Sequence, residues 1–219
     1  MNIENYKGVI FDFDGTLADT LEDLADSMNS ILISRGFPGH EYEKYKLFVG
    51  RGLENLVTTA IPENYRNPGI ISEIIAEMKR AYSMNCLNKS RLYEGIPELL
   101  DELTRRRIRL SIFSNKADDI VLIMAKYLLT SWNFEIILGS RPDIPKKPDP
   151  AGALLICGKL GIPTGSMIYL GDSGLDMITA RSAGIFPVGV LWGFRSGKEL
   201  LDNGAGILIS HPLELIYGK

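Results

Sequence analysis

Apolar residues follow two different spacings along this chain. Short continuous apolar runs predict buried strands at 8–13, 108–113, 134–138, 167–170, 187–192 and 207–209. Apolar residues at helical spacing predict helices over 96–106, 116–128, 150–160 and 175–183. Because strands and helices alternate, we expect an α/β fold: a doubly wound, Rossmann-like parallel sheet with helices on both faces.

The segment between the first and second predicted strands has a different pattern of apolar residues. Its spacing is helical throughout and predicts helices over 20–34, 41–48, 53–61 and 69–84. We expect Thr20 to cap the first of these helices, with Asp23 at the third position of a capping-box variant. An all-helical block between one strand and a later series of strands is typical of an insertion.

Polar side chains follow the predicted strands where each one ends. In a parallel sheet these ends share one edge, which is where ligands bind. The side chains expected there, with a lysine that precedes the helix at 150–160, are Asp12, Asp14, Ser114, Asn115, Lys147, Asp172 and Asp176. Burying carboxylates costs free energy unless cations neutralise them, so we expect an active site at this edge.

Each of these residues has a simpler interpretation when it is taken alone. Asp14 and Gly15 could form an ordinary turn, Ser114 could cap a helix and Lys147 could lie in solvent. A calcium loop starting at Asp12 is excluded, because Leu17 stands where the loop requires glycine. Because all of these polar groups are expected at one sheet edge, we favour a catalytic site over these simpler interpretations.

Four short motifs in this chain resemble those of the haloacid dehalogenase superfamily, in the same order. They are Asp12-Phe13-Asp14-Gly15-Thr16, Ser114-Asn115, Lys147-Pro148 and Gly171-Asp172-Ser173-Gly174-Leu175-Asp176. The resemblance extends along nearly the whole chain. It implies a catalytic core formed by residues 1–18 and 89–219, with the helical block 19–88 as an inserted cap domain.

The two aspartates of the first motif suit phosphoryl transfer. Asp12 would be the nucleophile that forms an aspartyl-phosphate. Asp14 would act first as general acid toward the leaving oxygen and then as general base toward water. Two carboxylates in different environments can divide these roles.

The expected cofactor is Mg²⁺, because the site offers only oxygen ligands. The resemblance implies that Asp12 and Asp172 supply carboxylate oxygens and Asp14 its backbone carbonyl. Asp176 would be a ligand or a support for the ligands, and Lys147 would neutralise Asp12 and the phosphoryl oxygens.

Ser114 is expected to act in catalysis, and Thr16, Asn115 and Arg51 are expected to bind the substrate. Ser114 would donate its hydroxyl to the phosphoryl group, helped by backbone N–H groups near Thr16 and Asn115. Arg51, in a glycine-flanked turn of the cap, could hold a substrate carboxylate, or it could be an ordinary surface residue. Within the superfamily, the segments 49–53, 145–150 and 189–195 look like those of the phosphoglycolate phosphatase group. In this group the second motif is often followed by Lys-Pro, whereas in this chain Lys116-Ala117 follows Ser114-Asn115.

Composition narrows the choice of partners. The formal net charge of −3 argues against nucleic acid, and no apolar run approaches a membrane-spanning length. The N-terminal residues 1–5 lack the pattern of a signal peptide, so we expect a cytoplasmic protein, monomeric or homodimeric, with a small phosphate ester as its partner.

The expected activity is Mg²⁺-dependent hydrolysis of a small phosphomonoester such as 2-phosphoglycolate. A sugar-phosphate mutase and an inorganic pyrophosphatase of the same fold are alternatives, as is a non-catalytic binding protein on the same scaffold. Fold alone does not select among them.

Overall fold

The computed structural model describes residues 3–218 of the 219-residue chain. Its main sheet has six parallel strands in the order β5-β4-β1-β6-β7-β8. Their bounds are Gly8–Phe11 (β1), Arg109–Ala117 (β4), Phe134–Ser140 (β5), Met167–Gly171 (β6), Phe186–Val190 (β7) and Ile207–Ile209 (β8). The expected doubly wound α/β fold is confirmed, and the strand order changes direction at β1, where ligands of such sheets bind.

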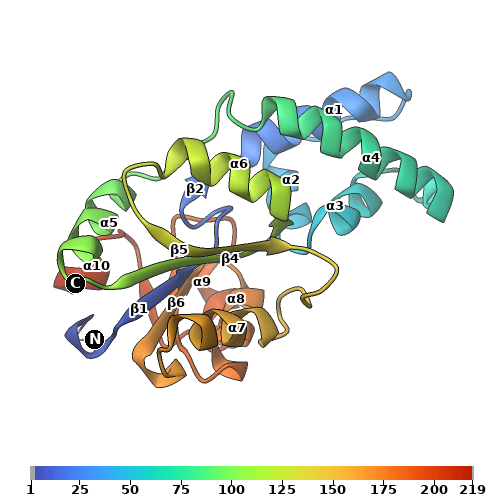
Figure 1. Cartoon of the computed structure of the whole chain (residues 1–219). Coiled ribbons are helices and arrows are strands. Elements are labelled where there is room, and N and C mark those ends of the chain that lie inside the picture. The colour runs from blue at the N-terminus through green and yellow to red at the C-terminus, as the bar shows by residue number, and fades with distance from the viewer. Residues whose placement is uncertain (1–2, 219) are drawn as a thin grey trace.

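Helices cover both faces of this sheet (Figure 1). They are α5 (Ile96–Arg105), α6 (Asp118–Leu128), α7 (Ala151–Leu160), α8 (Gly174–Ser182), α9 (Gly197–Asp202) and α10 (Glu214–Tyr217). Successive residues of β1 point to opposite faces. Val9 and Phe11 pack in the cluster that includes α5 and α6, whereas Ile10 packs in the cluster that includes α7 and α8.

The helical insertion lies at one end of the sheet (Figure 1). It contains α1 (Leu21–Ser34), α2 (Tyr42–Phe48), α3 (Leu53–Ala60) and α4 (Pro68–Asn85). We call this block the cap. Its assignment as a separate domain at 19–88 stays a prediction, as does the core at 1–18 and 89–219, of which residues 1, 2 and 219 lie outside the described part.

Two chain segments connect the cap to the sheet, and they pair with each other. Short antiparallel strands β2 (Ala18–Asp19) and β3 (Arg91–Leu92) run side by side. The Asp23 carboxylate accepts hydrogen bonds from the Lys89 N–H at 3.0 Å and from the Ser90 N–H and hydroxyl at 2.8 Å. The predicted capping box with Thr20 is therefore wrong, because Asp23 binds the returning segment instead.

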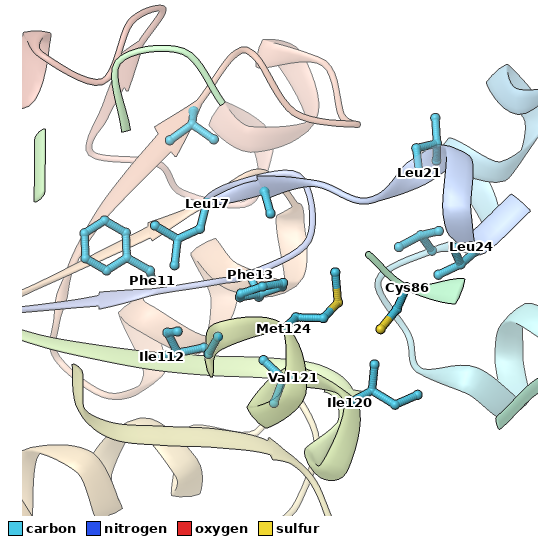
Figure 2. Close-up of a cluster of buried hydrophobic side chains, with 14 of the residues drawn as sticks. Phe11, Phe13, Leu17, Leu21, Leu24, Cys86, Ile112, Ile120, Val121 and Met124 are labelled. Carbon is cyan, nitrogen blue, oxygen red and sulfur yellow. The ribbon is translucent and has the colours of Figure 1, made fainter. Parts of the chain in front are cut away.

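Cap and core share one hydrophobic cluster (Figure 2). It runs from Phe11 on β1, past Met124 on α6, to Leu24 on α1 and Cys86 at the end of α4. All four side chains are buried. At about 25 cal/mol per Å² of buried apolar surface, such a contact holds the cap against the core.

Strand β4 is longer than the sequence predicts. Phe113 pairs with Leu138 and Ala117 with Ser140, so three residues of β4 face one of β5. This bulge delivers residues 114–116 to the sheet edge. The helix predicted from Lys116 therefore starts only at Asp118, because the chain stays extended through the bulge.

Some short elements were not predicted. These are α9, α10, β2, β3 and the 3-10 turns Ile3–Asn5, Glu63–Tyr65 and Thr164–Ser166. Within residues 3–218, no helix combines the length and apolar character needed to cross a membrane.

Candidate active site

Asp12 lies directly after β1, at the centre of the sheet edge. Its N–H donates to the Leu170 carbonyl at 2.9 Å, which fixes the backbone. Its Oδ1 accepts from the Phe13 N–H at 2.6 Å and pairs with Lys147 Nζ at 2.9 Å. Burial raises the pKa of Asp12 to about 7; Lys147 opposes that rise and Asp176 adds to it. The carboxylate is therefore short of positive charge.

Lys147 lies between two carboxylates. Its Nζ is 2.9 Å from Asp12 Oδ1 and 2.6 Å from Asp176 Oδ1. Burial lowers the pKa of Lys147, but the two carboxylates raise it well above its ordinary value, so the ammonium stays charged. The Asn115 side chain fixes the backbone here, because it accepts from the Lys147 N–H at 2.8 Å and donates to the Lys147 carbonyl at 3.1 Å.

Asp172 and Asp176 come from the turn between β6 and α8. Ser173 and Asp176 form a capping box: Asp176 Oδ2 accepts from the Ser173 N–H at 3.0 Å and from its hydroxyl at 2.6 Å. Asp172 Oδ2 accepts from the Phe194 N–H at 2.8 Å. Burial, with Asp176 and Asp12 nearby, raises the pKa of Asp172 well above its ordinary value.

These three aspartates could hold a divalent cation. One oxygen from each of Asp12, Asp172 and Asp176 lies within 4.8 Å of the others, and all three residues are buried. Only oxygen donors are present, which suits Mg²⁺. Burial, followed by repulsion among these carboxylates, raises the pKa of Asp12 and of Asp172, and a bound cation would oppose both effects. Both oxygens of Asp176 already accept hydrogen bonds, which favours a supporting role for it.

Asp14 faces a different environment from Asp12. Its Oδ1 accepts from the Thr20 hydroxyl at 2.6 Å and from Lys116 Nζ at 2.8 Å. Lys116 Nζ also donates to the Tyr82 hydroxyl, on cap helix α4, at 2.7 Å. The sequence pattern does not indicate Lys116 or Tyr82 as site residues, because Lys116 stands at the start of a predicted helix and Tyr82 lies in the distant insertion.

Three residues predicted to bind the phosphoryl group lie close to this edge. Ser114 is buried, and its Oγ accepts from the Lys116 N–H at 3.3 Å. Asn115 uses its side-chain amide on Lys147 and also donates to the Gly50 carbonyl of the cap at 2.9 Å. Thr16 Oγ1 is buried with no hydrogen-bond partner among the described residues. A buried hydroxyl without a partner is a candidate for ligand binding.

A pocket lies between the core edge and the cap. Asp12, Asp14, Ser114 and Lys116 line it from the core, with Asp172. The other lining residues are Leu24, Val49, Gly50, Gly52, Leu53, Leu56, Tyr82, Asn115, Ala117, Ile120, Ser173, Phe194 and Arg195. Asp12, Asp14, Ser114, Asn115 and Asp172 thus line the pocket, whereas the other predicted core residues, Thr16, Lys147 and Asp176, do not.

Arg51 differs from the other predicted residues. Its side chain is exposed and is not among the residues that line the pocket, although both neighbouring glycines are. Its role in substrate binding stays a prediction. Arg195 contacts the cap instead: its guanidinium donates to the carbonyls of Lys46 and, at 2.9 Å, of Val49.

Comparison with known proteins agrees with this geometry. The family described as haloacid dehalogenase-like hydrolase matches residues 9–190. The phosphoglycolate phosphatase of Mannheimia succiniciproducens is 31% identical over 204 residues, which cover 90% of this chain and 91% of the relative. The phosphoglycolate phosphatase of Pseudomonas syringae pv. tomato is 28% identical over 97% of this chain and 79% of its own length.

A solved structure has the same fold. The haloacid dehalogenase-like family hydrolase from Streptococcus pneumoniae superposes with a TM-score of 0.85 at 26% identity, over 96% of this chain and 97% of that one. The match includes the helical insertion as well as the sheet, since it covers nearly the whole chain.

Proposed function

Because the chain belongs to the haloacid dehalogenase-like hydrolase family, we propose that it is a Mg²⁺-dependent phosphatase acting on a small phosphomonoester. The observation that carries the proposal is the way in which the Asp12 carboxylate is held. Its Oδ1 is held by Lys147 and by the Phe13 N–H, which leaves Oδ2 to react. A carboxylate fixed on one oxygen beside a buried lysine is suited to nucleophilic attack on phosphorus.

The proposed reaction has two steps. Asp12 Oδ2 attacks phosphorus, the bond to the leaving oxygen breaks, and the proton of Asp14 moves to that oxygen. Water then attacks the aspartyl-phosphate and gives a proton to Asp14, and inorganic phosphate leaves with Asp12 restored. The same Asp14 thus serves as acid and then as base.

Positive charge and donors around the phosphoryl group come from several places. Asp12, Asp172 and the Asp14 carbonyl would hold Mg²⁺, which would neutralise charge on the phosphoryl oxygens. Lys147 adds a fixed positive charge at 2.9 Å from Asp12 Oδ1. The hydroxyls of Ser114 and Thr16 would donate to the same oxygens.

We propose 2-phosphoglycolate as the substrate. Similarity to relatives named phosphoglycolate phosphatase supports this choice. The pocket also fits a small substrate, because Leu24, Leu53 and Leu56 of the cap lie over the polar edge. Closure of the cap over this pocket would exclude bulk water while the phosphoryl group moves.

Phosphate release from a substrate panel tests the proposal. The panel contains 2-phosphoglycolate, hexose phosphates and pyrophosphate, each with Mg²⁺ or with EDTA. We expect Mg²⁺-dependent release that is fastest with 2-phosphoglycolate. Isomerised sugar phosphate without phosphate release would indicate a mutase, and preference for pyrophosphate a pyrophosphatase. Absence of turnover on every compound would support a binding protein and refute the proposal.

A further inference from the structure

Lys116 is a buried cation that the proposed reaction does not use directly. Its Nζ lies 2.8 Å from Asp14 Oδ1 and 2.7 Å from the Tyr82 hydroxyl, and 4.5 Å from the centre of the Tyr82 ring. Its side chain is 4% exposed. Burying an ammonium is costly unless hydrogen bonds and an opposite charge offset the cost, and these two partners supply both.

The position of Lys116 depends on the irregular end of β4. The bulge between Phe113 and Ala117 places Lys116 on the pocket wall with Asp14. A regular strand followed directly by a helix would not hold residues 114–116 at this edge. The structure thus has two buried lysines at one site, Lys147 beside Asp12 and Lys116 beside Asp14.

We infer that Lys116 is a positioning residue, which holds the Asp14 carboxylate in place for proton transfer and does so fully only when Tyr82 of the cap is in contact. This inference rests on the proposed function, because it takes Asp14 as the general acid and base. Lys116 itself is not required to touch the substrate.

The hydrogen bonds at Asp14 support this role. Thr20 and Lys116 both contact Oδ1, so Oδ2 is the oxygen left to exchange a proton with the leaving group. Among residues 3–218, removing Lys116 would leave only the Thr20 hydroxyl to orient the carboxylate by a side-chain hydrogen bond. Because Tyr82 lies on α4, displacement of the cap would remove one partner of the Lys116 ammonium.

Dependence on the leaving group separates positioning of Asp14 from general damage. An alkyl leaving group such as glycolate needs a proton from the acid, whereas p-nitrophenolate leaves without much help. The measured quantity is the ratio of kcat/KM for 2-phosphoglycolate to kcat/KM for p-nitrophenyl phosphate. General acid catalysis contributes about 10²–10⁴-fold, so we expect Lys116→Met to lower this ratio by about 10–100-fold.

A double variant tests whether Lys116 acts through Asp14. We expect Asp14→Asn to lower the ratio further than Lys116→Met, and the Asp14→Asn/Lys116→Met variant to match Asp14→Asn alone. Exposed Lys126→Met on α6 is the matched control and should keep the wild-type ratio. An equal loss on both substrates in Lys116→Met, or a double variant clearly below Asp14→Asn, would overturn the inference.

Tyr82→Phe keeps both buried charges and so tests the inference even if Lys116→Met fails to fold. It removes only the hydroxyl that Lys116 contacts, and we expect the ratio to fall by about two- to fivefold, as for loss of one hydrogen bond of about 0.5–1 kcal/mol. An unchanged ratio in Tyr82→Phe would overturn the part assigned to the cap. Absence of turnover in the wild-type enzyme would instead refute the proposed function, so the two failures are distinguishable.

Discussion

Asp12 and Asp14 are two residues apart but belong to differently built halves of the site. The Asp12 half consists of Asp12, Lys147, Asp172 and Asp176, and all four come from the core. The Asp14 half consists of Asp14 and Lys116 from the core, Thr20 at the entrance to the cap, and Tyr82 inside it.

This difference shows that one sheet edge can place two carboxylates in environments of different net charge. In the Asp12 half, three carboxylates surround one lysine that pairs with only two of them, Asp12 and Asp176, so negative charge is in excess and a cation would bind. In the Asp14 half, one carboxylate has one lysine, so the charges balance without a metal. A cap side chain, that of Tyr82, takes part directly in the Asp14 half, whereas the cap reaches the Asp12 half only indirectly, through the Asn115 hydrogen bond to the Gly50 carbonyl.

Loss of the nucleophile should have the largest effect. We expect Asp12→Asn to reduce phosphate release by at least about 10⁴-fold, because the covalent intermediate cannot form. Steady-state phosphate release with Mg²⁺ measures this effect. Asp143→Asn, on an exposed loop, is the control and should keep full activity. Near-wild-type turnover in Asp12→Asn would refute the assignment of Asp12.

Removal of the shared lysine should destabilise the fold. We expect Lys147→Met to lower the free energy of unfolding by about 3–5 kcal/mol without Mg²⁺, since it leaves buried carboxylates without their counter-ion. Urea denaturation measures the change, with exposed Lys159→Met on α7 as the control. A loss below about 1 kcal/mol would show that the Asp12 half does not carry the charge excess described above.

Binding of Mg²⁺ should depend on pH. The pKa of Asp12 rises from 3.8 to about 7, so between these values the folded protein keeps a proton that the unfolded chain releases. Without metal, the stability contributed by Asp12 therefore falls as pH rises from about 4 to 7. Because Mg²⁺ competes with that proton, we expect Mg²⁺ to raise Tm little at pH 5.

At pH 7.5, Mg²⁺ at a hundredfold excess over Kd should raise Tm by about 5–10 °C. Thermal unfolding with Mg²⁺ or EDTA at several pH values gives the comparison, and Asp12→Asn should flatten the pH dependence. Equal Mg²⁺ shifts at pH 5 and pH 7.5 would contradict this account of Asp12.

A change at Thr20 should have the smallest effect and should be confined to the Asp14 half. Thr20→Val removes the hydroxyl bonded to Asp14 Oδ1 at 2.6 Å, and we expect a loss of about 1 kcal/mol in stability. Thr20→Ser keeps the hydroxyl and serves as the control. Mg²⁺ affinity, from Tm titrations, should be unchanged in both variants. A weaker Mg²⁺ affinity in Thr20→Val would show that the two halves are not independent.

Much of the fold and the core site was predictable from the sequence, because its signals are local. Buried strands such as Met167–Gly171 are continuous apolar runs, and Asp12 and Asp172 directly follow β1 and β6. Ser114 directly follows the predicted strand 108–113, although the observed β4 continues through it. Parallel strands bring such ends together whatever the details of packing.

The residues that were missed depend on contacts across long sequence distances. Lys116 looked like the first residue of a helix, and only the bulge against β5 keeps it extended. The sequence pattern places Asp23 in a capping box, but its hydrogen-bond partners are Lys89 and Ser90. Strands β2 and β3 have two residues each, too few to show a period.

The pairing of β2 with β3 would limit the directions in which the cap could move relative to the core. Both connections to the cap run as one ribbon, which Asp23 ties to Ser90 just beyond it. A ribbon of two hydrogen-bonded chains bends more readily across its plane than within it, so the cap would swing about a single axis. Tyr82 would then approach and leave Lys116 along one arc, and opening the entrance for substrate and breaking the contact behind Asp14 would be the same movement.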